Sequence, residues 1–146
     1  MYYIGLGTIS PRKLAMIDQN PFFQSKHGFV RWEPDLRAVY SVVDGPLEDA
    51  EYQGLMQMVL ELAALKGSKL WLANHLKSRP ANQAMLAWTS DLWVPMADQI
   101  GFTSIAALMP ERTATRMSLE RLLGKRLELR FFTEHQEARA WLLETP

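Results

Sequence analysis

The chain has 146 residues, 48% of them apolar and 22% charged, which is the composition of a folded globular domain and excludes overall disorder. Sixteen basic residues balance sixteen acidic ones, so no net charge would attract nucleic acid or an anionic membrane over a distance. The absence of cysteine excludes disulfides, thiolate metal sites and a cysteine nucleophile.

The first residues, "MYYIGLGTISPRKLAM", do not show the basic-then-apolar order of a secretory signal. No apolar run approaches the roughly 18 residues that a membrane-spanning helix needs. We therefore expect a cytoplasmic protein without a membrane span. Residues 1–20 are hard to classify and are treated as an N-terminal extension, and residues 21–146 as one domain.

The first clear pattern is a β-hairpin. "GFVRWE" alternates in polarity, "PDL" follows as a turn, and "RAVYSVV" supplies a second β-branched run. From Leu47 to Lys66 apolar residues recur at helical spacing, and Gly67 is suited to end that helix. Lys69 to Ala73 is short and nearly all apolar, which predicts a strand covered on both faces at the centre of the sheet.

The second half of the chain alternates helix and strand. A helical pattern runs from about Ala81 to Gly101, and Pro95 is expected to kink or restart it. "SIAALM" predicts a strand, Arg112 to Leu123 a helix and "LELRFF" the last strand, and Thr133 to Gln136 has the spacing of a capping box. The order predicts an α/β fold: a mixed, mostly parallel sheet of about five strands, with an N-terminal β-hairpin and about four helices. Trp71 and Trp141 are expected in its core.

Three stretches carry a resemblance to a known family: the hairpin, "KLWLAN" and "LRFFTEHQEARAWL". "AWTSDLWVPMADQIGFTSIAALMP" is similar to the middle segment of the same group. Over about Phe22 to Leu143 the chain resembles the STAS-like superfamily, and within it the stand-alone SpoIIAA-like group, related to bacterial anti-sigma-factor antagonists. The resemblance implies a non-enzymatic, regulatory module that binds a protein partner or a small ligand, with no cofactor.

The chain departs from the antagonists at their regulatory position. In that family an aspartate and a phosphorylatable serine or threonine open the helix after the third strand. Here that place reads Arg79-Pro80-Ala81-Asn82-Gln83, and the nearest hydroxyl, Ser78, comes one turn too early and follows no aspartate. We expect no phosphorylation switch at this position.

Basic side chains follow three of the predicted strands. His75 and Arg79 follow the first, Arg112 the second and His135 the third. Because parallel strands end at the same edge of a sheet, these four residues form the predicted ligand-binding site, suited to an anionic group. The simpler interpretation is that they belong to polar loops exposed to water.

Other functions have less support in the sequence. Nothing in the spacing of His75, His135 and Asp44 enforces a metal geometry, so no metal is expected. "GLGTIS" lacks the nucleophile elbow, the phosphate loop and the dinucleotide fingerprint, so no catalytic residues are assigned and an unrecognised enzyme is a third hypothesis. The second hypothesis is a carrier of a small hydrophobic or anionic ligand in a cleft near Trp93. An apolar strip at Met58 and Leu65 would favour a homodimer.

Overall fold

The computed structural model describes residues 21–110, 116–117, 120–121 and 127–145. The N-terminal extension, Arg112 and most of the helix predicted over Arg112 to Leu123 lie outside these residues. The described strands are β1 (Phe23–Gln24), β2 (Gly28–Glu33), β3 (Ala38–Gly45), β4 (Leu70–Ser78), β5 (Ser104–Leu108) and β6 (Glu128–Phe132). The described helices are α2 (Asp49–Lys66), α3 (Gln83–Trp88), α4 (Val94–Ile100) and α6 (His135–Glu144), with a π-helical turn, η2 (Thr89–Trp93), between α3 and α4.

The six strands form one mixed sheet in the order β1-β2-β3-β4-β5-β6. β2 is antiparallel to both β1 and β3, whereas β3, β4, β5 and β6 are parallel to one another. The predicted α/β class and mostly parallel sheet are confirmed. The predicted strand count of five is wrong, because the two-residue β1 adds a sixth strand. A strand of two residues is too short to show an alternating pattern in the sequence.

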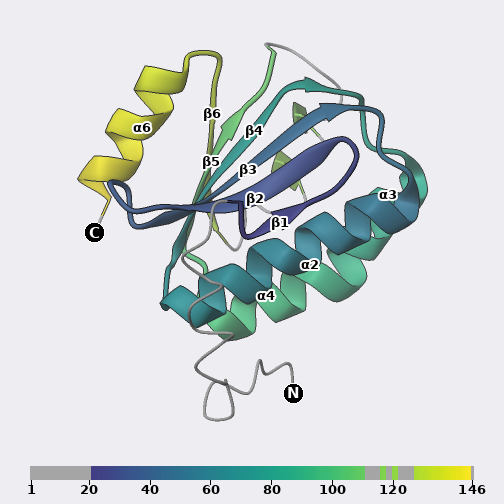
Figure 1. Ribbon diagram of the computed structural model, residues 1–146, viewed down its shortest axis with the longest axis horizontal. Coiled ribbons are helices and arrows are strands. Elements are labelled where there is room, and N and C mark those ends of the chain that lie inside the picture. The colour runs from purple at the N-terminus through teal and green to yellow at the C-terminus, as the bar shows by residue number, and fades with distance from the viewer. Residues whose placement is uncertain (1–20, 111–115, 118–119, 122–126, 146) are drawn as a thin grey trace.

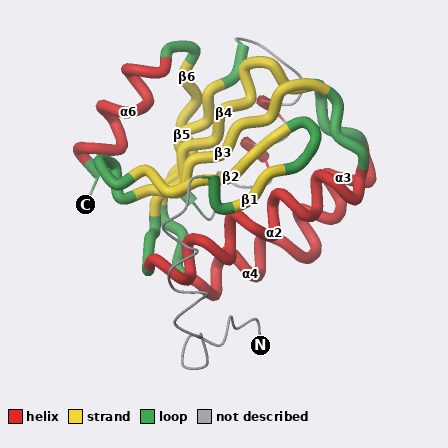
Figure 2. Tube along the Cα trace, in the orientation of Figure 1, coloured by secondary structure: helices red, strands yellow, loops and turns green. Residues whose placement is uncertain are grey.

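The helices divide between the two faces of the sheet. α2, α3 and α4 cover one face and α6 covers the other (Figures 1 and 2). Parallel strands are joined by right-handed crossovers, so successive crossovers that advance in the same direction put their helices on the same face. The chain leaves β6 at the edge of the sheet, and α6 can therefore fold over the opposite face.

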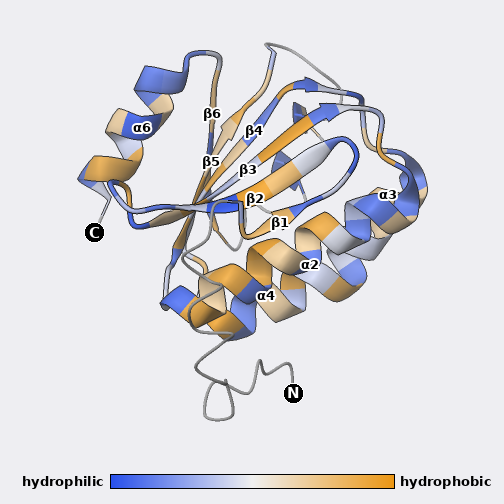
Figure 3. Ribbon diagram, viewed as in Figure 1, coloured by the Kyte–Doolittle hydropathy of each residue, from blue (hydrophilic) through white to orange (hydrophobic). Residues whose placement is uncertain are grey.

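Each face has its own apolar core. The row Val39, Trp71, Ile105 and Leu129 runs across four parallel strands toward α2, while the neighbouring row runs toward α6. Figure 3 shows apolar residues along the strands that these helices cover. This arrangement follows from the alternation of side chains along a strand, which gives a doubly covered sheet two separate cores.

Strand β4 is longer than the sequence predicts. It continues past Ala73 to Ser78, where Gly45 is its partner on β3. β5 ends opposite Asn74, so the last residues of β4, from His75 to Ser78, pair on one side only, and all of them except Leu76 are polar. The apolar run therefore marks only the part of β4 that lies between two neighbouring strands.

Two helix predictions can be compared in detail. The restart predicted at Pro95 is confirmed, since the π-helical turn η2 precedes it and α4 begins at Val94. The predicted capping box is wrong, because Glu134 is the N-cap residue of α6 and its side chain makes no capping bond.

Trp71 is 3% exposed as predicted, but Trp141 is only half-buried. None of the described helices combines the length and the apolar character required to cross a bilayer.

Candidate functional site

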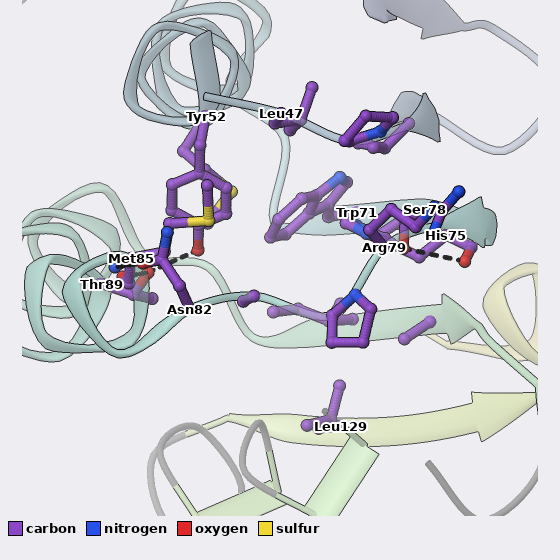
Figure 4. A pocket seen from close by; sticks show the side chains of 18 residues that line it. Leu47, Tyr52, Trp71, His75, Ser78, Arg79, Asn82, Met85, Thr89 and Leu129 are labelled. Carbon is purple, nitrogen blue, oxygen red and sulfur yellow. Dashed lines mark hydrogen bonds between the residues drawn. The ribbon is translucent and has the colours of Figure 1, made fainter. Parts of the chain in front are cut away.

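A cavity of about 160 Å³ lies between the sheet and helices α2 and α3, toward the carboxyl ends of the parallel strands. We call it the sheet-edge cavity. Figure 4 shows Tyr52, Met85 and Thr89 at one end and His75, Ser78 and Arg79 at the other. Its wall is completed by Val43, Pro46, Leu47, Met56, Trp71, Ala73, Pro80, Ala81, Asn82, Ile105, Ala107 and Leu129.

A bulge in β4 shapes one end of the cavity. Val42 pairs with Asn74 and Asp44 with Lys77, so β4 has one residue more than β3 between these two pairs. The extra residue falls at His75 or Leu76. Ser78 Oγ donates to the His75 carbonyl oxygen at 3.1 Å, a hydrogen bond between two residues of the bulged end of β4. Bulges re-aim side chains, and this one lies where His75 borders the cavity.

The opposite end carries a pair of buried hydroxyls. Tyr52 on α2 and Thr89 in η2 share a hydrogen bond of 2.5 Å, and Thr89 Oγ1 also lies 2.7 Å from the Met85 carbonyl oxygen. Burial raises the pKa of Tyr52, and the bond to Thr89 offsets part of that rise. The phenol is therefore neutral at physiological pH and supplies a polar point on an otherwise apolar wall.

The cavity reaches the surface along the segment from β4 to α3. Arg79, Pro80 and Asn82 border it there and are exposed. Asn82 is the N-cap of α3: its Oδ1 accepts from the Met85 N–H at 2.8 Å, and its Nδ2 donates to Asp49 Oδ1 at 2.9 Å. These bonds hold the segment between the first turns of α2 and α3 and fix the position of the opening.

His75 is half-buried, and no described residue makes a hydrogen bond to its ring. Burial lowers its pKa to about 4, so the imidazole is neutral at physiological pH. A neutral imidazole has one donor and one acceptor nitrogen. His75 thus brings unused hydrogen-bonding capacity to the border of the cavity.

His135 lies on the other face of the sheet. Its ring packs edge-on against Tyr40 with centroids 5.7 Å apart, and its Nε2 is 3.3 Å from the Tyr40 hydroxyl oxygen. Asn74 Nδ2 donates to the same hydroxyl at 3.1 Å. Burial lowers the pKa of His135, and the guanidinium groups of Arg139 and Arg31 act in the same direction against the opposing effect of Glu33.

The structure therefore separates the predicted site residues. His75 and Arg79 border the same cavity, His135 lies across the sheet from them, and Arg112 is outside the described residues. All parallel strands end at one edge, but that edge has two faces, and His135 begins α6, the helix that covers the face opposite the cavity. Among the described residues no group of three histidines or carboxylates is placed to hold a metal ion.

The tryptophan of the predicted cleft is part of the core. Trp93 has no exposed surface, donates its indole N–H to the Met56 carbonyl oxygen at 2.9 Å and packs 5.4 Å from the Trp71 ring. Trp71 lines the cavity, and Trp93 does not. Sequence reasoning also missed the Tyr52 and Thr89 pair, although a threonine on a buried helix stripe is a signal that a hydroxyl has a partner inside.

Comparisons of this chain with known protein families, with curated proteins and with solved structures found no match. The site is therefore interpreted from its geometry and chemistry alone.

Proposed function

We propose that this protein is a non-enzymatic STAS-like module that binds a small ligand with a compact apolar body in the sheet-edge cavity. The observation that carries the proposal is the cavity itself, about 160 Å³ in volume and lined mainly by apolar side chains. An engineered apolar cavity of about 150 Å³ takes up benzene. A single ring or a short acyl chain is therefore the size of ligand that we expect.

The energetics of packing support this use of the cavity. Protein interiors are close-packed, and an unfilled void costs about 24 cal/mol per Å³. For 160 Å³ that is on the order of 4 kcal/mol as an upper limit, because this cavity reaches the surface at Arg79. A ligand that replaces the missing contacts would stabilise the protein, and the rigid walls given by the sheet and α2 favour such binding.

The family assignment has separate support. The resemblance depends on two features that the structure contains. One is a β-hairpin ahead of parallel strand and helix units, and the other is a final helix with the Ala-x-x-Trp-Leu sequence at Ala138 to Leu142. A homodimer has less support, since Met58 and Leu65 are both half-buried. A protein partner stays an alternative to the small ligand, and a carrier role is the alternative to a regulatory one.

The proposal is tested with a substitution that fills the cavity. Ala107 is 3% exposed and lines the cavity from β5, so Ala107→Leu places three more carbon atoms inside it. Ala87→Leu makes the same change at an exposed position of α3 and is the control. Native mass spectrometry of the purified protein reports bound small molecules, and thermal shifts with toluene, benzamide and benzoate report binding.

We expect at least one of these single-ring probes to raise the melting temperature of the wild type and of Ala87→Leu, but not of Ala107→Leu. If no probe stabilises the wild type more than Ala107→Leu, and no small molecule is carried through purification, the cavity is not a ligand site.

A further inference from the structure

The permanent charge among the described residues that line the sheet-edge cavity is positive. Among its described lining residues Arg79 is the only one with a permanent charge, and none is an aspartate or a glutamate. Asp49, which accepts a hydrogen bond from Asn82, and Asp44, which is opposite Lys77 in the strand register, are not among the residues that line the cavity. A cationic ligand would therefore meet Arg79 without a counter-charge, whereas an anionic ligand would be paired by it.

Two hydrogen-bonding side chains lie together at the end of the cavity formed by β4. Figure 4 shows His75 and Arg79 at that end, with Ser78 beside them. They are four residues apart: His75 lies in the bulged end of β4, Ser78 is the last residue of that strand, and Arg79 follows it; Ser78 Oγ donates to the His75 carbonyl oxygen. Arg79 offers a planar fork of donors, and the His75 ring has no hydrogen-bond partner among the described residues.

We infer, on the basis of the proposed function, that the ligand is a compact monocarboxylate whose ring or short chain fills the cavity and whose carboxylate is bound between Arg79 and His75. One carboxylate has the four lone-pair directions needed to accept from both side chains. A single charge suits the site, since Arg79 is the one permanent cation in the described lining. The apolar part of the cavity wall, which includes Trp71 and Met85, accommodates the rest of the molecule.

Binding of such an anion is coupled to a proton. In the free protein burial holds the pKa of His75 at about 4. A carboxylate beside the ring favours the imidazolium and raises this pKa, so the complex binds more protons than the free protein and affinity rises as pH falls toward 5. The other charged or titratable side chains that line the cavity are Arg79 and the neutral phenol of Tyr52, and Lys77 and Asp44 lie near His75 at the ends of β4 and β3.

The experiment compares three probes of nearly the same shape: benzoate, benzamide and benzylamine. Calorimetric titrations at pH 5 and pH 7.5 give their dissociation constants for the wild type. We expect benzoate to bind about 10- to 100-fold more tightly than benzamide at pH 5. Benzylamine should bind more weakly than benzamide. Only the affinity for benzoate should fall as the pH is raised.

Two pairs of variants locate the effect. Arg79→Gln should remove most of the preference for benzoate, whereas Lys77→Gln, two residues away and also exposed, should keep it. His75→Gln should abolish the pH dependence, whereas His135→Gln, on the opposite face of the sheet, should not. A melting curve for each variant separates lost binding from lost folding.

The two proposals fail in different ways. Equal affinities for benzoate and benzamide, or a benzoate preference unchanged in Arg79→Gln, would overturn the carboxylate assignment and leave the cavity as a site for neutral ligands. Failure of every probe, with no difference between the wild type and Ala107→Leu, would overturn the proposed function itself.

Discussion

The hydrogen bond between Trp71 and Ser41 is a buried polar link in the core under α2, and its loss can be worked out in advance. Trp71 Nε1 donates to Ser41 Oγ at 2.9 Å, and Ser41 has no exposed surface. Replacing Trp71 with phenylalanine keeps an aromatic ring but removes the N–H and half of the indole. The hydroxyl of Ser41 is then left buried without this donor.

An unsatisfied buried hydroxyl costs about 1–3 kcal/mol, and the space left by the smaller ring adds to that cost. We expect Trp71→Phe to lower the free energy of unfolding by about 2–4 kcal/mol, out of a total of about 5–15 kcal/mol for a domain. Ser41→Ala orphans the indole N–H and should cost about 1–2 kcal/mol. In the double variant neither polar group remains unpaired, so its cost should be about 1 kcal/mol less than the sum.

Urea denaturation followed by far-ultraviolet circular dichroism measures the four free energies, because tryptophan fluorescence would change with the substitution itself. Trp141→Phe is the matched control. Trp141 is half-buried, its N–H has no partner among the described residues, and its loss should cost less than about 1 kcal/mol. Costs of Trp71→Phe and Ser41→Ala that simply add in the double variant would refute the reasoning, since the two groups would then not stabilise one another.

Three further outcomes are expected. Burial alone would raise the pKa of Glu51, but hydrogen bonds from His27 and Ser25 outweigh it and hold the pKa below its usual 4.5. Glu51→Gln should therefore lower the free energy of unfolding by about 1–2 kcal/mol at pH 7. Urea titrations should show this difference from the wild type shrinking below pH 4.5, because the wild-type carboxylate is then protonated. A difference that does not change with pH would contradict this prediction. Gly67 ends α2 with φ 63°, so Gly67→Ala should destabilise the protein by about 1 kcal/mol. At Gly54, inside α2, an added Cβ meets nothing within 4 Å, so Gly54→Ala should stabilise the protein by about 0.5–1 kcal/mol and raise its melting temperature. Equal shifts in the melting temperatures of the two variants would count against the left-handed cap. Phosphopeptide analysis of the protein from cells should find no stoichiometric phosphate on Ser78, and its presence with a changed partner would show that the switch exists.

The sequence by itself determined the local elements of this protein. The hairpin of β2 and β3, helix α2 and its end at Gly67 were predicted because alternation, helical spacing and a left-handed glycine are properties of neighbouring residues. The mostly parallel sheet followed too, since alternating strands and helices permit few connections. The sequence also predicted that His75 and Arg79 both follow the central strand; in the structure Arg79 does, whereas His75 lies within β4.

Only the tertiary structure decided what those residues border. β4 continues to Ser78 because β3 pairs with it there, and a strand partner is not visible in the residues of β4 alone. Tyr52 and Thr89 are 37 positions apart and meet because α2 and the α3 segment pack on the same face. His135 ends on the opposite face from His75, because the face is set by pleat alternation and the path of the chain beyond β6, which act over distances that no local pattern records.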